Sequence, residues 1–233
     1  MRMSHRRRRL GVTTVVLSGA LLVSGCGSFY PGSAARIGDT TVSMDHLDNL
    51  ATAYCQAFVA NGKLTGSAFP VEAGVAKRRQ VLGIIEENIL AKGAAAKLGV
   101  TANPADYTSN AAQISSLLKA MPAKYRAPLL EVVTMSSQST QLEINIGDKL
   151  IGGDPTKIDT QTAQKAGQQY VTKYAASVPV TFDPRFGVDR NGGLVNGGSG
   201  SLSAGLSSLA TAPSDASSTS SYAASLPPSQ VCG

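Results

Sequence analysis

The sequence predicts a mainly α-helical domain in which a small two-stranded ribbon joins the N- and C-terminal ends. Two observations predict this class. Apolar residues recur with the three- and four-residue spacing of amphipathic helices over long segments between residues 43 and 176. Stretches with strand character fall at the two ends of that interval, over residues 35–42 and 178–182. Because two strands alone are barely stable, we expect the ribbon to pack against the helices.

The first two helices have clear boundaries. Ser43 can cap the free N–H groups of the turn that follows it, so we expect the first helix to begin there. Its apolar positions have helical spacing: Met44, Leu47, Leu50, Ala51, Tyr54 and Phe58. A loop over residues 61–66 and then Pro70 lead to a second long helix, which Gly99 ends.

Three more helices are expected before the closing strand. Asn103 and Pro104 suit the start of a third helix, which Pro122 terminates. Pro128 opens a fourth, and the Ser/Gln/Thr run over residues 136–140 predicts a kink or break in its middle. The last helix covers residues 160–176 and leads into the strand that pairs near Ile37.

Composition divides the chain into four parts. We assign residues 1–25 to a signal peptide, 26–34 to a spacer, 35–187 to the helical domain and 188–233 to a tail. The tail is rich in Gly, Ser and Ala and almost uncharged, which is typical of flexible segments. The domain, about 150 residues long, is large enough for one modest core.

The N-terminal segment has the pattern of an export signal. Four arginines, residues 6–9, precede an apolar run over residues 10–23, which is shorter than the roughly 18 apolar residues that cross a bilayer. The positions at its end resemble the lipobox of bacterial lipoproteins: Val23, Ser24, Gly25 and Cys26. That resemblance implies that Cys26 receives a diacylglycerol and becomes the first mature residue. An ordinary signal peptide that carries a cysteine is the alternative, and both the Sec and the twin-arginine route are open.

The basic charge of the chain belongs to this signal. The whole sequence carries a net charge of +6, but residues 1–25 contain five arginines and no acid, which leaves 16 basic and 15 acidic residues. A mature chain close to neutrality offers no electrostatic argument for a nucleic-acid partner. The expected partner is instead the membrane, through the lipid on Cys26 at the extracytoplasmic face of the cell membrane.

Two cysteines are left for pairing once Cys26 is acylated. Cys55 and Cys232 are an even number in an exported chain, which predicts a disulfide between them. Such a bond would close nearly the whole mature chain and stabilise it by about 4 to 5 kcal/mol as an upper figure. The alternative is two separate thiols, with Cys55 buried in its helix.

The residues offer little for catalysis. The mature chain has one histidine, His46, at the start of the first helix, and no Gly-x-Ser-x-Gly elbow, phosphate loop or zinc-ligand spacing accompanies it. Glu86 and Glu87 are adjacent on a helix and are expected on a solvated face rather than as an acid/base pair. We therefore expect no enzyme, cofactor or metal.

Four features occur in a recognisable order: Ala35–Ser43 before a capped helix, Tyr54-Cys55, Asp183–Gly187 and the late Cys232-Gly233. This order resembles SurA-type N-terminal chaperone domains, and in particular short actinobacterial lipoproteins of that group. Gly38-Asp39 stands where most members read Asn-Gly. The family often carries a parvulin-type prolyl isomerase domain, for which this chain leaves no room between residues 151 and 180.

The resemblance implies binding of unfolded or extended segments of exported proteins by a helical cradle. Candidate contributors to a peptide groove are Val75, Leu82, Ile85, Leu117 and Leu118, for which the alternative is an ordinary place in the core. A second hypothesis is a structural or adaptor lipoprotein that docks one folded partner of the envelope. Prolyl isomerase activity is a third.

Overall fold

The computed structural model describes residues 32–67, 72–108, 113–152, 158–188, 223–227 and 230–232. The lipobox and most of the tail lie outside these residues. The described part is mainly helical, with a small antiparallel sheet, as the sequence predicts. Its helices are α1 (Met44–Thr65), α2 (Gly74–Leu98), α3 (Pro104–Thr108), α5 (Ser115–Ala120), α6 (Ala123–Ile151) and α7 (Thr160–Ala175). Its strands are β1 (Ser33–Ile37), β2 (Thr40–Ser43), β3 (Glu72–Ala73), β4 (Val180–Phe182) and β5 (Val231–Cys232).

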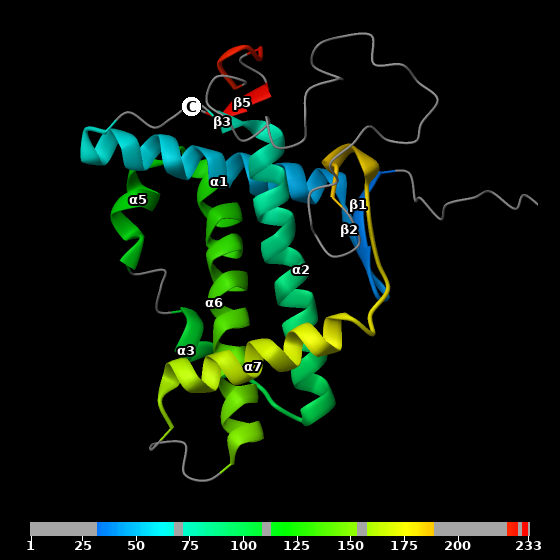
Figure 1. The fold of residues 1–233 in the computed structure, drawn as a ribbon. Coiled ribbons are helices and arrows are strands. Elements are labelled where there is room, and N and C mark those ends of the chain that lie inside the picture. The colour runs from blue at the N-terminus through cyan, green and yellow to red at the C-terminus, as the bar shows by residue number, and fades with distance from the viewer. Residues whose placement is uncertain are drawn as a thin grey trace, which may run out of the picture.

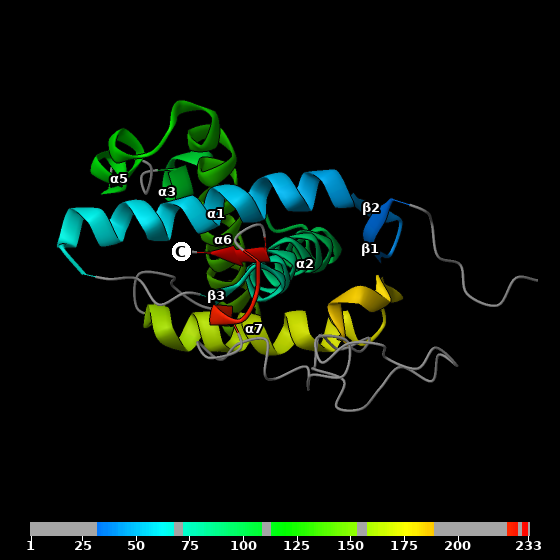
Figure 2. The same ribbon diagram turned by 90° about the horizontal axis from the view of Figure 1, so that it is seen from above.

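Two long helices, α2 and α6, lie side by side and form the centre of the domain (Figure 1). Helix α1 crosses one end of this pair, and α7 crosses it nearer the other end. Figure 2 shows α1 and α7 on opposite sides of α2, and Figure 1 shows the short β3–β5 pair at the end of α2 that α1 crosses. The shortest helices, α3 and α5, lie along one side of α6.

The predicted pairing of the two chain ends is confirmed, but the ribbon has three strands rather than two. Ile37 on β1 is the partner of Val180 on β4, so the sheet has the order β2-β1-β4. The stretch over residues 35–42, expected to have strand character, is a hairpin, because Gly38, at a φ of 56°, turns the chain back so that β2 pairs with β1. The sheet thereby joins the N-terminal strands of the domain to its C-terminal strand.

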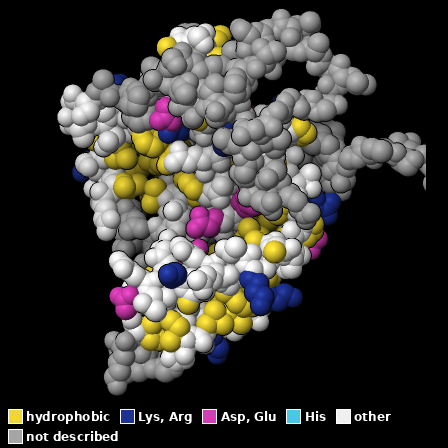
Figure 3. Space-filling view, viewed as in Figure 1, with side chains coloured by type: hydrophobic (Ala, Val, Ile, Leu, Met, Phe, Trp, Pro, Cys, Tyr) yellow, Lys and Arg dark blue, Asp and Glu magenta, His cyan; other side chains and the backbone are white. Residues whose placement is uncertain are grey.

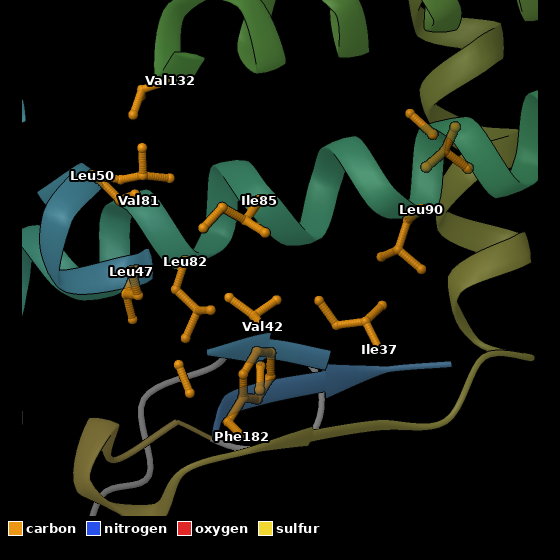
Figure 4. Close-up of a cluster of buried hydrophobic side chains, with 14 of the residues drawn as sticks. Ile37, Val42, Leu47, Leu50, Val81, Leu82, Ile85, Leu90, Val132 and Phe182 are labelled. Atoms are coloured by element: carbon orange, nitrogen blue, oxygen red, sulfur yellow. The ribbon is translucent and has the colours of Figure 1, made fainter. Parts of the chain in front are cut away.

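The main core lies where this sheet meets α1 and α2 (Figure 4). Side chains from three sources converge there, because the sheet contributes Ile37, α1 contributes Leu47 and α2 contributes Val81, each 1% exposed or less. Phe182 of β4 closes the cluster from the sheet side. The strands are short, and burial of their apolar face against helices supplies the stability that they lack alone.

The ends of the first two helices agree with the sequence prediction. The hydroxyl of Ser43 accepts a hydrogen bond from the backbone N–H of His46 at 3.2 Å, and α2 ends at Gly99 with a φ of 64°. The expected loop over residues 61–66 is wrong, because α1 continues to Thr65 and Gly66 caps it in the left-handed region. Within the range expected for the third helix, the structure describes α3 and α5.

The prediction of a broken fourth helix starting at Pro128 is wrong. Helix α6 starts at Ala123 and runs without a break to Ile151, with Pro128 inside it. The Ser/Gln/Thr run stays helical because tertiary contacts satisfy its polar groups. Asn88 of α2 donates to the carbonyl of Met135 at 3.0 Å and to the hydroxyl of Ser139, which is fully buried. Packing between α2 and α6 thus outweighs weak intrinsic propensity.

Candidate functional site

Cys55 and Cys232 form a disulfide, as the cysteine count predicts. Their Cα atoms are 5.6 Å apart and 177 residues separate them along the chain. Cys55 lies in α1, and Cys232 lies in β5, which pairs with β3 immediately before α2. We call the disulfide and the β3–β5 pair the C-terminal clasp. The expectation that the end of the chain is tied back at Cys55 is therefore confirmed.

The clasp holds the chain end tightly against the domain. Cys232 is 1% exposed and Ala223 is fully buried. The antiparallel ladder pairs Glu72 with Cys232 and Ala73 with Val231. Gly74 permits the close approach, since a Cβ atom there would lie 3.2 Å from the carbonyl oxygen of Gln230. The chain end thus lies as an extended strand against α1 and the start of α2 (Figure 2), and we call this place the niche.

Charged side chains surround this niche and are paired with each other. Lys77 is 5% exposed, yet its ammonium lies 2.8 Å from Glu72 and 4.0 Å from the ring centroid of Phe58. Arg78 of α2 pairs with Asp48 of α1. Burial, followed by the charge of Glu72, raises the pKa of Tyr54. A cavity of about 160 Å³ opens here, and both cysteines, Lys77 and Arg78 are among its lining residues.

A second region of interest is an apolar patch between α5 and the upper part of α6, below α1 (Figure 3). The floor of this patch consists of five buried residues, Ala53, Ala57 and Ala60 of α1 together with Met121 and Leu129. The half-buried apolar side chains around that floor, which we call the α5 patch, are Tyr54, Ile114, Leu117, Leu118, Tyr125 and Val133. Helix α5 itself contributes no fully buried residue.

The structure separates the five residues predicted for a peptide groove. Leu82 and Ile85 are 2% and 5% exposed and belong to the main core, so they cannot line an open groove. Leu117 and Leu118 are half-buried members of the α5 patch. Val75 is half-buried at the start of α2 and belongs to neither apolar cluster. The predicted groove residues therefore do not form one site.

Sequence reasoning missed one buried carboxylate, that of Glu143, where α6 packs against α7. Glu87 is exposed, as expected for a solvated face, and Glu86 is half-buried; partial burial raises the pKa of each. Glu143 of α6 is 3% exposed, and its Oε2 atom has no hydrogen-bond partner. Burial is the main cause that raises the pKa of Glu143; the amides of Gln168 and Gln164 oppose the rise, and repulsion from Glu87 adds to it.

Close packing between α6 and α7 explains the burial of Glu143. A Cβ atom on Gly167 would lie 1.8 Å from the carbonyl oxygen of Glu143, and one on Gly147 would lie 1.8 Å from that of Ala163. The two helices therefore touch backbone to backbone. Glycines inside a helical pattern are a sequence signal of such contact, and they could have indicated this crossing.

The predicted lipobox, Val23 to Cys26, lies outside the described residues. None of the described helices is long and apolar enough to cross a bilayer. Among the same residues, no group of three or more His, Cys, Asp or Glu is placed to hold a metal ion. His46 is a surface residue whose Nε2 lies 3.2 Å from Glu131.

Comparisons with protein-family models, with curated proteins and with solved structures find no match for this chain.

Proposed function

We propose that the protein is an exported, lipid-anchored, non-enzymatic chaperone-like protein that binds unfolded or extended polypeptide segments at the outer face of the cell membrane. The observation that carries the proposal is the α5 patch, where apolar side chains stay only partly buried around a floor of three alanines, Met121 and Leu129. Contiguous exposed apolar surface is typical of sites that bind polypeptides. The disulfide supports export, because such bonds persist in oxidising compartments.

Suppression of aggregation tests the binding activity. Purified mature protein, kept oxidised, should suppress light scattering by a heat-aggregated client at stoichiometric amounts. The double variant Leu117→Asp/Leu118→Asp should lose at least about half of this effect, because charges in the patch would have to be desolvated when a client binds. Leu150→Asp/Ile151→Asp is the matched control, since each of these two residues is 45% exposed and lies at the far end of α6. No suppression with several clients would reject the proposal.

The anchor has its own test. In cells, Cys26→Ser should abolish incorporation of labelled fatty acid and move the protein from the membrane fraction to the soluble extracytoplasmic fraction, because the two-chain lipid is the proposed hold on the membrane. Unchanged membrane partitioning of this variant would contradict lipid anchoring.

An adaptor that docks one folded partner is the second candidate. The exposed pair Leu150 and Ile151 favours it, because it forms an apolar tip away from the α5 patch. Crosslinking in cells separates the two functions: an adaptor should yield one or two defined products, and a chaperone should yield many.

A further inference from the structure

The last residues of the chain bind their own domain in the way that a separate peptide would. Strand β5 adds to β3 by antiparallel main-chain pairing, and its Cys232 side chain fills a buried position. Addition of an extended strand to a sheet edge is a recurrent mode of peptide recognition, in which the main chain gives affinity and alternate side chains give specificity. Strand β3 has two residues, and β5 is its one partner in the described sheet.

We propose that the niche between α1 and the start of α2 is a peptide-binding site, that the chain's own C-terminal segment occupies it, and that the Cys55–Cys232 disulfide keeps it closed. Reduction of the disulfide releases β5 and opens the niche to an extended segment of another protein. This inference rests on the proposed function, because it names a second binding place for the same class of partner.

The disulfide is the bond on which closure depends. The β3–β5 ladder covers two residues on each strand, and so short a pair is not stable by itself. The disulfide ties this ladder to α1 and removes the freedom of a long stretch of chain. Once the bond is broken, retention of β5 depends on the short ladder and on the burial of Ala223 and Cys232.

The cavity beside the disulfide gives a reductant access. It has a volume of about 160 Å³ and both cysteines line it. We name a dithiol as the reductant. One of its thiolates attacks a sulfur of the bond, forms a mixed disulfide and frees the other cysteine as a thiolate. The second thiol of the reductant then closes its own disulfide, so that Cys55 and Cys232 gain two electrons and two protons in total.

The shape of the niche defines the segment that fits it. The buried position now filled by Cys232 takes a small, uncharged side chain, because Cys232 is 1% exposed and the charges of Glu72, its partner across the ladder, and Lys77 are already paired. The backbone of the segment must pass close to Gly74. An extended segment with small side chains satisfies both conditions, as the chain's own end does.

Peptide binding tests the inference. The probe is a fluorescein-labelled peptide with the sequence of residues 223–232, in which Cys232 is replaced by serine, and the readout is fluorescence anisotropy. The variant Cys55→Ser/Cys232→Ser of the full mature chain should bind the probe at least about tenfold more tightly than the oxidised wild type. Adding Gly74→Val to that variant should remove the binding, because the new side chain would meet the strand that lies there.

Equal affinity of the oxidised wild type and the double serine variant would overturn the inference, as would a lack of binding by a variant with native helical circular dichroism. If that variant does not fold, wild-type protein with and without dithiothreitol replaces it. Hydrogen exchange at the Val231 amide should then rise at least about tenfold on reduction, and unchanged protection would reject the release of β5. Suppression of aggregation by the oxidised protein is measured separately, so failure of the proposed function and failure of the clasp give different results.

Discussion

Helices α7 and α5 both pack across longer helices, but they are held in different ways. Helix α7 meets α6 through Gly147 and Gly167, where backbone touches backbone, and it buries Ala163 and Val171. Helix α5 lies against α1, buries none of its residues completely and leaves Leu117 and Leu118 only partly buried. The α6–α7 contact leaves no room for larger side chains, whereas the contact of α5 with α1 keeps apolar surface near solvent.

This difference in packing suggests that one region determines stability and the other determines binding. Tightly packed interiors resist any change in volume, so the α6–α7 crossing is expected to set the stability of the domain. A loosely held element is easier to displace and is the natural place for a partner to bind. Substitutions at the crossing should therefore affect unfolding, and substitutions in the α5 patch should affect binding.

The largest effect is expected when a methyl group is added at the crossing. Gly167→Ala should lower the free energy of unfolding by about 3 kcal/mol, because the new Cβ atom would overlap the carbonyl of Glu143 and the helices would have to separate. Gly83→Ala is the matched control in α2, where a Cβ atom would meet nothing within 4 Å, and it should stabilise by about 0.5 to 1 kcal/mol. Denaturant unfolding followed by circular dichroism measures both, and equal effects would disprove the rigid crossing.

A smaller effect distinguishes the floor of the α5 patch from its surface. Leu129→Ala should cost about 2 kcal/mol, because Leu129 is 2% exposed and the substitution leaves a cavity. Leu118→Ala should cost about 1 kcal/mol or less, since its side chain is only partly buried. Unfolding midpoints of the two variants test this order, and a reversed order would show that α5 belongs to the stabilising core.

The start of α1 and the end of α2 could be predicted because local residues determine them. Ser43 and Gly99 act through hydrogen bonds and backbone freedom within one turn. The continuous α6 could not be predicted in this way, since its Ser/Gln/Thr run is stabilised by Asn88 from another helix. Local propensity indicated a break, and a contact between residues distant in sequence removed it.

The same limit applies to the candidate sites. Cysteine parity was enough for the pairing of Cys55 with Cys232, because few alternatives exist for two cysteines. Helical periodicity could not tell Leu82 and Ile85, which face the sheet, from Leu117 and Leu118, which lie in the patch. Apolar spacing identifies a buried face but not what covers it. The burial of Glu143 likewise follows from the approach of α7, which no feature near Glu143 indicates.

The smallest expected effect is a pH dependence at the α6–α7 crossing. Burial raises the pKa of Glu143 above its ordinary value of 4.5, Glu87 adds to the rise, and the amides of Gln164 and Gln168 oppose it. An acid whose pKa is higher in the folded chain binds its proton more tightly there. Its contribution to stability is therefore complete below the unfolded pKa and is lost as the pH rises through the folded pKa.

Glu143→Gln should remove this loss, because the amide cannot ionise. The variant should be more stable than the wild type at pH 7, by less than Gly167→Ala costs, and the difference should shrink as the pH falls toward 4.5. Asp39→Asn, in the exposed turn between β1 and β2, is the control and should leave the difference between pH 4.5 and pH 7 as it is in the wild type. Thermal unfolding across this range tests the prediction. Parallel curves for Glu143→Gln and the wild type would mean that the carboxylate is solvated at neutral pH, and α7 would then be as loosely held there as α5.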